Sequence, residues 1–254
     1  MSMLMFPKYK ERYQMLKSRN AKDWWTATFG DPLSWVILAV IADWKFISPN
    51  LLTIITFITK VAASGMIAFG NRSVVIIGAV FLQIGVLFDH MDGNLARYRN
   101  STTMKGGFMD RILDGISVLI IFSSLSWHIY SQGNSVYYLL IGPSTASFYL
   151  IICYMYWSYA FYEHKTLGGS SKVNPGANDL RDRKISTLNY IIKGQKKFFN
   201  FNHIDYYFWI SFAIIIGQPE VILWLLFVIV GYKVIDRFLM RMNHLDKLDR
   251  QKGL

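Results

Sequence analysis

Apolar residues along this chain are gathered into six long runs that are separated by polar segments. The runs cover about residues 51–70, 74–97, 108–130, 136–162, 204–217 and 219–242. A helix needs about 20 predominantly apolar residues to cross the hydrocarbon core of a membrane. The fifth run is short, so its helix is expected to tilt little or to begin earlier. The pattern predicts an all-α membrane protein with six transmembrane helices.

A shorter apolar run at residues 33–42 precedes the six and stops at Asp43. Four tryptophans surround it, and tryptophan favours the headgroup level of a membrane. We therefore expect an N-terminal amphipathic helix that lies in the interface. Basic residues between positions 8 and 22 are mixed with acidic and aromatic ones, which is not the pattern of a signal peptide.

Glycine, asparagine and proline predict tight connections at 70–72, 131–134 and 217–219. The longest polar segment, 164–203, is expected to be a basic cytoplasmic loop, with a basic surface helix at 184–199. It is interpreted as a connector on anionic lipid, with a substrate lid as the alternative.

The chain is thus divided into three parts. Residues 1–48 form an N-terminal cytoplasmic and interfacial helical segment, 49–243 the six-span domain, and 244–254 a cytoplasmic tail.

The composition excludes several classes of protein. Of the 254 residues, 53% are hydrophobic and 17% charged, which is incompatible with a disordered chain. The single cysteine, Cys153, excludes a disulfide scaffold. The net charge of +11 does not indicate nucleic acid as a partner, because the basic residues lie between apolar runs rather than in one patch.

The basic residues predict the orientation in the membrane. Lys and Arg number seven before residue 49, four between the second and third runs, eight between the fourth and fifth, and six from Lys233 onward. The connections after the third and fifth runs have none. Positively charged loops stay in the cytoplasm, so both termini are expected there. The alternative is that a basic protein scatters such residues by chance.

Four aspartates lie where the second run ends and the third begins. Asp89 and Asp92 are three residues apart, and Asp110 and Asp114 are four apart, so each pair shares a helix face. Consecutive spans pack together, so the four carboxylates are expected to converge at the cytoplasmic end of the membrane. Oxygen ligands suit Mg²⁺ or Mn²⁺, and four carboxylates have room for two ions, a pairing suited to phosphoryl chemistry.

Small residues and an arginine accompany these acids. Gly93 and Ala96 leave space for a ligand, and Gly106, followed by Gly107, permits a tight turn. Arg97 has the forked donors that bind a phosphate. The alternative for the aspartates is pairing with arginines at a helix end, namely Arg97, Arg99 and Arg111.

Written out from Asp89 to Asp114, these residues read D-x2-D-G-x2-A-R-x8-G-x3-D-x3-D. This resembles the signature of the CDP-alcohol phosphotransferase family of membrane enzymes, and every fixed position is filled. Residues 48–53, Ser-Pro-Asn-Leu-Leu-Thr, are similar to the segment that opens the family's first span. The resemblance extends over about residues 30–130 and is only architectural beyond.

The resemblance implies transfer of a substituted phosphate from a CDP-linked donor to an alcohol, with release of CMP. It makes Asp89, Asp92 and Asp110 metal ligands, and Asp114 both a ligand and the base for the acceptor's hydroxyl proton. It also implies a homodimer surrounded by membrane lipids. The residues expected at the CDP donor are Asn50, Thr53, Gly93, Ala96, Arg97, Thr103 and Gly106.

The residues favour no particular headgroup. Inositol-phosphate-using members of the family usually have an arginine after the last aspartate, where this chain has Gly115. The choline and ethanolamine branch tends to have Asp-His-Gly-Cys-Asp at the end of the motif, where residues 110–114 of this chain read Asp-Arg-Ile-Leu-Asp. We expect CDP-diacylglycerol or an archaeal equivalent as donor; the alternative is a CDP-linked headgroup transferred to a lipid or glycan hydroxyl.

Other basic residues have two readings each. Three basic residues of the last run are spaced at four-residue intervals: Lys233, Arg237 and Arg241. Lys233 and Arg237 are candidates for binding a phosphate of the donor or acceptor. The alternative is the cytoplasmic excess of positive charge. Lys60 lies within the first span, where it either snorkels to the interface or faces the polar cavity.

Two rival functions fit the acids less well. Intramembrane prenyl transfer also uses aspartate-rich motifs with Mg²⁺, but it gives Gly93, Ala96 and Arg97 no role. A cation transporter would place its acids near the middle of the membrane, whereas these lie at the predicted cytoplasmic end.

Overall fold

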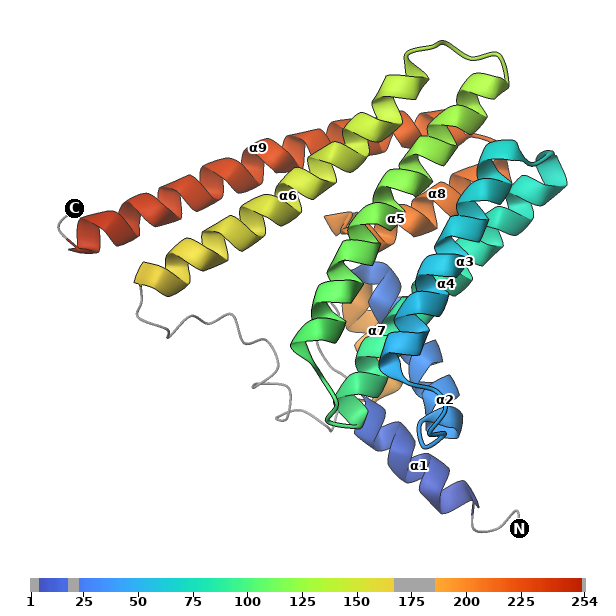
Figure 1. The fold of residues 1–254 in the computed structure, drawn as a ribbon, viewed down its shortest axis with the longest axis vertical. Coiled ribbons are helices and arrows are strands. Elements are labelled where there is room, and N and C mark those ends of the chain that lie inside the picture. Colours follow the sequence, from blue (N-terminus) through green and yellow to red (C-terminus); the bar gives the residue numbers. More distant parts are fainter. Residues whose placement is uncertain (1–4, 18–22, 167–185, 253–254) are drawn as a thin grey trace.

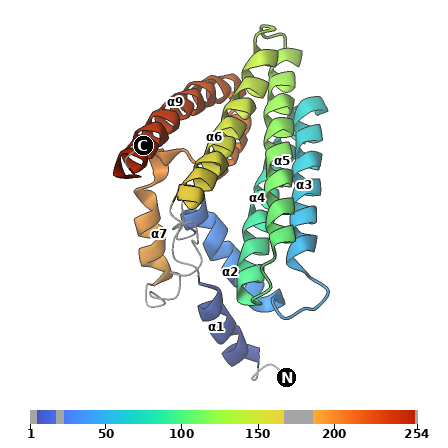
Figure 2. The ribbon, with the colours of Figure 1, turned by 60° about the vertical axis from the view of Figure 1, so that its left-hand side comes forward.

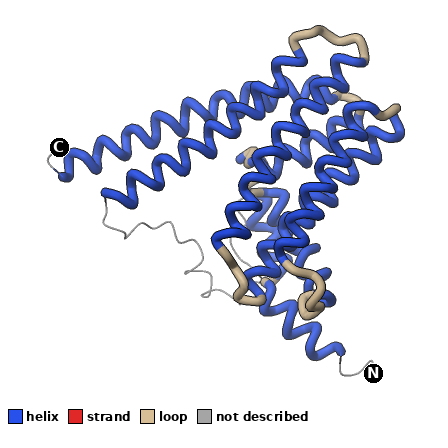
Figure 3. The backbone as a smooth tube through the Cα atoms, viewed as in Figure 1, coloured by secondary structure: helices blue, strands red, loops and turns tan. Residues whose placement is uncertain are grey.

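The computed structural model describes residues 5–17, 23–166 and 186–252. These residues form helices, and no strand occurs among them (Figure 3). The long helices are α3 (Pro49–Phe69), α4 (Arg72–Tyr98), α5 (Met104–Ser131), α6 (Tyr138–Thr166) and α9 (Pro219–Lys252). The shorter ones are α1 (Met5–Leu16), η1 (Thr26–Gly30), α2 (Asp31–Ile41), α7 (Thr187–Gln195), η2 (Phe198–Asn200) and α8 (His203–Ile216).

Among the described residues, four helices are long and apolar enough to cross a membrane: α3, α4, α5 and α6. They correspond to the first four predicted runs and indicate an integral membrane protein. The fifth run is helix α8, which is apolar but has only 14 residues. The sixth begins α9, whose 34 residues continue into a charged second half beyond the predicted end at 242. Six spans therefore stay a prediction.

Side-chain caps explain where three long helices begin. Ser48 accepts a hydrogen bond from the Leu51 amide at the start of α3, and Asn71 accepts one from Val74 at the start of α4. Thr103 accepts one from Gly106 at the start of α5. Each cap satisfies a backbone N–H that has no partner in the first turn. The predicted turn at 70–72 is confirmed, because α3 ends at Phe69 and α4 begins at Arg72.

The long helices form two groups that meet at one end. Helix α3 packs on α4 and α5, and α4 also packs on α8. Helix α6 packs on α5 beyond their shared loop, as the 4.3 Å contact between Arg111 and the Trp157 ring shows. It also runs beside α9, and the α6–α9 pair leans away from the other long helices (Figures 1 and 2). The largest buried cluster joins α3, α4, α5, α8 and α9 around residues such as Leu82, Phe122 and Leu223.

The turn between α3 and α4 is tied to the end of α8. Arg72 donates from Nη1 to the Ile214 carbonyl at 2.7 Å and from Nη2 to the Ile215 carbonyl at 2.8 Å. Gly217 then ends α8 with a φ of +78°, a conformation that favours glycine. The last carbonyls of α8 thus have protein partners.

The N-terminal helices and α7 gather at the opposite end of α4. The amide of Trp25 donates to Asp205 at 2.9 Å, and the Trp24 indole donates to Gln195 at 2.7 Å. Helix α2 overlaps the predicted 33–42 run, and α7 lies within the predicted 184–199. That the N-terminal helix is amphipathic and lies in the membrane interface stays a prediction. Residues 167–185, most of the predicted basic loop, lie outside the described residues.

At Gly142, α6 approaches α5 so closely that a Cβ there would overlap Ser126 Oγ and the Phe122 carbonyl oxygen. Gly142→Ala should therefore lower the free energy of unfolding by about 1–3 kcal/mol through overpacking. The matched control is Gly65→Ala on α3, where a Cβ meets nothing within 4 Å. Unfolding in mixed micelles should leave the control as stable as the parent or slightly more so. Equal stability of the two variants would contradict this close approach.

Candidate active site

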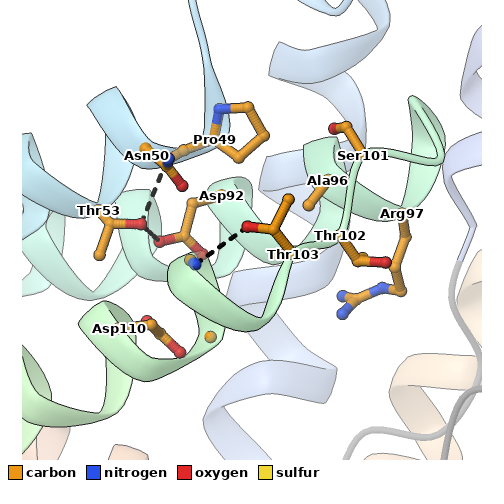
Figure 4. Close-up of a pocket in the computed structure, with 13 residues that line it drawn as sticks. Pro49, Asn50, Thr53, Asp92, Ala96, Arg97, Ser101, Thr102, Thr103 and Asp110 are labelled. Atoms are coloured by element: carbon orange, nitrogen blue, oxygen red, sulfur yellow. Dashed lines mark hydrogen bonds between the residues drawn. The ribbon is translucent and has the colours of Figure 1, made fainter.

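A cavity of about 160 Å³ lies where the start of α3, the end of α4 and the start of α5 meet. The connection from Ser101 to Thr103 closes one side (Figure 4). All seven residues expected at the CDP donor line it: Asn50, Thr53, Gly93, Ala96, Arg97, Thr103 and Gly106. The fold thus brings together residues of the 48–53 segment with residues from both halves of the aspartate motif.

Asp92 faces this cavity and is held by α3. Its carboxylate accepts a hydrogen bond of 2.6 Å from the Thr53 hydroxyl and is buried (Figure 4). Thr53 also approaches the Pro49 carbonyl at 3.2 Å. The opening turn of α3 therefore positions an acid that belongs to α4.

The other three predicted acids form a cluster beside the cavity. Asp89, Asp110 and Asp114 each offer a carboxylate oxygen, and these oxygens all lie within 4.8 Å of one another. Asp110 also lines the cavity, so it borders both places. The expected convergence is thus observed for three acids rather than four. Residues three apart on a helix point about 60° apart, which turns Asp92 toward Thr53 and away from this group.

Lys60 on α3 points into the acidic cluster. Its ammonium lies 3.2 Å from Asp89 Oδ1 and 2.9 Å from Asp114 Oδ1, and its side chain is completely buried. Lys60 was expected either to snorkel to the interface or to face a polar site. The structure supports the second interpretation, because the ammonium contacts the acids. A charged side chain inside a span is costly and usually functional.

The cluster fits a hard divalent cation. Its ligands are carboxylate oxygens, which Mg²⁺ and Mn²⁺ prefer. Asp89 comes from α4 and Asp110 and Asp114 from α5, two helices that both pack on α3. The three acids are only partly buried, so an ion and its waters can approach them. His90, the one histidine next to the motif, points elsewhere: its Nε2 lies 2.7 Å from the Thr26 hydroxyl and its ring packs on Trp25.

Arg97 reaches the cavity from the last turn of α4 and is oriented by a chain of polar contacts. Its Nη2 donates to Asn94 Oδ1 at 2.6 Å. The Asn94 amide in turn donates to Ser34 at 2.7 Å and to Asp31 at 3.3 Å. The Tyr190 hydroxyl of α7 donates to the other oxygen of Asp31. Burial raises the pKa of Asp31 above its usual value. The charge of His90 and the hydrogen bonds from Tyr190 and Asn94 lower the pKa, but by less than burial raises it.

The start of α5 is packed closely against the start of α3. A Cβ on Gly106 would lie 3.0 Å from Asn50 Oδ1 and from Thr103 Oγ1. The glycine therefore lets both polar side chains border the cavity, in addition to permitting the predicted tight turn.

The predicted phosphate contacts on α9 lie apart from the cavity lining. Lys233 donates to the carbonyls of Asn200 and Phe201 and lies over the Tyr206 ring, contacts that fix η2 to α9. Arg237 is exposed one turn further along. Arg241 lies over the rings of Tyr156 and Tyr159 on α6.

Sequence reasoning missed three residues of this site: Asn94, Asp31 and Tyr190. Asn94 stands at a variable position of the motif, and the other two lie far from it in sequence. The sequence does contain a signal for Asn94, because it is a polar residue on the inward face of an amphipathic helix. In the structure its side chain is 3% exposed. Nothing in the sequence indicates that Tyr190 meets Asp31.

Comparison with known proteins agrees with this geometry. Residues 46–192 match the family model described as CDP-alcohol phosphatidyltransferase. Because the match covers more than half of the chain, the chain belongs to this family of transferases. The match includes the cavity and the acidic cluster, and it ends within helix α7.

Curated relatives of this chain include two proteins whose names describe an enzyme. A bifunctional IPC transferase and DIPP synthase of Aquifex aeolicus is 32% identical over 82 residues, which is 32% of this chain and 18% of that protein. An archaetidylinositol phosphate synthase of Pyrococcus horikoshii is 30% identical over 102 residues, 40% of this chain and 53% of that protein. The aligned part of this chain spans about half, or less, of the length of these relatives.

Proposed function

We propose that this member of the CDP-alcohol phosphatidyltransferase family transfers a substituted phosphate from a CDP-linked donor to an alcohol and releases CMP. The observation that carries the proposal is that Asp110 borders both the cavity and the acidic cluster. A donor bound in the cavity would therefore present its pyrophosphate at the acids. Because the cavity and the acidic cluster are neighbours, the aspartates of the motif can act on a bound donor rather than only pair with arginines.

The residues of the chain supply binding and proton transfer. Arg97 has forked donors for a phosphate of the CDP group, while Asn50 and Thr103 border the same cavity with polar atoms. Asp114 accepts the proton of the acceptor's hydroxyl, whose oxygen forms a bond to the transferred phosphorus. The bond from that phosphorus to the CMP oxygen breaks, and CMP leaves with the electron pair.

We assign the divalent ion to Asp89, Asp110 and Asp114, with Asp92 at the cavity side of the site. When bound, Mg²⁺ or Mn²⁺ would neutralise the pyrophosphate and the leaving CMP. We expect two ions, because the four carboxylates have room for a pair.

For the donor, a lipid carrying the CDP group, such as CDP-diacylglycerol or an archaeal equivalent, is our first choice. The name of the Pyrococcus relative joins an archaetidyl lipid to an inositol phosphate, which supports a phospholipid product. Gly115 argues against inositol phosphate as the acceptor. The second arrangement is a CDP-linked headgroup transferred to a lipid or glycan hydroxyl. Lys233 and Arg237 remain candidates for a phosphate of the donor or acceptor.

We also propose six spans, with α8 and the first part of α9 as the fifth and sixth, and both termini in the cytoplasm. Basic loops on that side support the orientation. A homodimer is proposed from the family alone.

The test is CMP release by the purified protein in lipid nanodiscs with Mg²⁺. One set of reactions supplies CDP-diacylglycerol with a pool of alcohols that includes inositol 1-phosphate and glycerol 3-phosphate. A second supplies CDP-choline, CDP-ethanolamine or CDP-glycerol with diacylglycerol. Mass spectrometry of the lipids identifies the product. We expect release in the first set and none when the metal is removed with EDTA.

Each outcome separates the candidates. Release only in the second set would reverse the assignment of donor and acceptor. Failure of release in both sets, with Mn²⁺ also tried, would contradict the proposal for these substrates. Metal flux into sealed vesicles under the same conditions would then favour a cation transporter.

A further inference from the structure

Building on the proposed binding of a CDP group in the cavity, we propose that Asp31 and Tyr190 are positioning residues that act on the donor through Arg97. Asp31 begins α2 and Tyr190 belongs to α7, so both lie outside the aspartate motif. Neither side chain lines the cavity. Their effect passes through Asn94, because the side-chain amide of this residue has two orientations and only one of them holds Arg97.

Arg97 needs such support because its side chain is exposed at the last turn of α4. Its guanidinium lies along Gly93, where a Cβ would be 3.3 Å from Nη1, and it borders the cavity (Figure 4). A free arginine side chain loses conformational entropy when it is fixed by a ligand. The bond from Nη2 to Asn94 Oδ1 removes part of that cost before the donor binds.

The orientation of the Asn94 amide is set by two acceptors on its other side. Its Nδ2 lies 2.7 Å from Ser34 Oγ and 3.3 Å from Asp31 Oδ1. The Ser34 hydroxyl donates its proton to the Asp31 main-chain carbonyl at 3.0 Å, so its oxygen is left to accept. The NH₂ group therefore faces the two acceptors, and the amide oxygen faces Arg97. A reversed amide would turn its NH₂ group toward the guanidinium.

The acceptor side of this amide is enclosed by protein. The Asp31, Ser34 and Asn94 side chains are all buried. A buried polar group that loses its partner pays the full cost of its lost hydration. Removal of the Asp31 acceptor should therefore destabilise the observed orientation of the Asn94 amide, and with it the position of Arg97.

Tyr190 fixes the carboxylate from the side of α7. Its hydroxyl donates to Asp31 Oδ2, and its ring packs on Trp35 with 5.2 Å between the centroids. Helix α7 is itself held closely against η1, because a Cβ on Gly194 would overlap Ala27 Cβ. The contacts thus connect a helix far along the chain to the arginine at the cavity.

The experiment measures the affinity of the full protein in nanodiscs for CDP, by isothermal titration at saturating Mg²⁺. Asp31→Leu removes the acceptor and should lower the affinity by about 2–10-fold, less than Arg97→Ala does. Asp31→Asn keeps an acceptor oxygen and should recover most of the loss. Tyr190→Phe keeps the ring and should lower the affinity by about 2–5-fold. Tyr137→Phe, at a position that is 68% exposed, is the matched control and should bind as the wild type does.

A second measurement separates positioning from a merely structural role. When Arg97→Ala is already present, Asp31→Leu and Tyr190→Phe should cause no further loss of CDP affinity, because both act through the missing arginine. General damage to the fold would instead lower the affinity by the same factor with and without Arg97. Thermal unfolding shows whether each variant is folded.

Unchanged CDP affinity in a folded Asp31→Leu, or an equal loss with and without Arg97, would overturn the proposed role, as would a wild type that does not bind CDP. If Asp31→Leu does not fold, Tyr190→Phe in the same two backgrounds decides. CMP release from the donors is measured on the same preparations. The expected losses of CDP affinity without any release would refute the transfer reaction and leave the role of Asp31 and Tyr190 standing.

Discussion

Asp114→Asn is expected to lower the rate of CMP release by about 10²–10⁴-fold, the contribution of a general base. The amide has nearly the size of the carboxylate but cannot take the acceptor's proton. At saturating Mg²⁺, affinity for the CDP donor should fall less than the rate does, because Asp114 does not line the cavity and acts on the donor only through the ion. The rate is measured in nanodiscs at saturating donor and acceptor, and donor affinity by competition with CMP.

The control for Asp114→Asn is Asp246→Asn, which removes an exposed acid of α9 that is paired only with Arg250 in this structure. It should release CMP at the wild-type rate. Thermal unfolding of both variants shows whether each is folded. Wild-type turnover in Asp114→Asn would contradict the assignment of the base.

Arg97→Ala is expected to raise the KM for the CDP donor by about 10–100-fold, with a smaller effect on kcat. A hydrogen bond to a charged group is worth about 1.5–3 kcal/mol, and every 1.4 kcal/mol is tenfold in affinity. Arg97→Lys should recover only part of the loss, because an ammonium lacks the two parallel donors of a guanidinium. Steady-state kinetics with the donor as the varied substrate measures both.

The structure offers an internal check on this assignment. Asn94→Leu removes the acceptor that orients Arg97 at 2.6 Å while leaving the arginine in place. It should raise the same KM, by less than Arg97→Ala. Arg250→Ala, at an exposed position, should leave KM unchanged. An unaltered KM in Arg97→Ala would mean that the cavity does not hold the pyrophosphate.

The long helices could be predicted closely because their signals are local. Apolar runs set their length, and the capping residues Ser48, Asn71 and Thr103 set their starts to within a few residues. The order of the acids along two consecutive spans likewise predicted that a cluster would form. These features depend mainly on spacing along one helix. The expected direct packing of the second and third spans is not what brings the acids together, because α4 and α5 both pack on α3 rather than extensively on each other.

The composition of the cluster was not predictable in the same way. Whether the Lys60 side chain enters the acidic cluster depends on how α3 is rotated against α4. That rotation is fixed by close contacts between the two helices, such as Gly85 against Lys60. The contact between Asp31 and Tyr190 joins residues 159 positions apart. Such a contact depends on the path of the whole chain and leaves no periodic pattern in the sequence.

The bond between Arg72 and the end of α8 bears on the thickness of the surrounding bilayer. A helix of 14 residues rises about 21 Å, whereas the hydrocarbon core measures about 30 Å. Because Arg72 satisfies the carbonyls of Ile214 and Ile215, the end of α8 can stop short of the far headgroups at a lower cost in unpaired peptide groups. As a span, α8 would favour a membrane that is thinner beside this helix than beside α4 and α5, which have 27 and 28 residues.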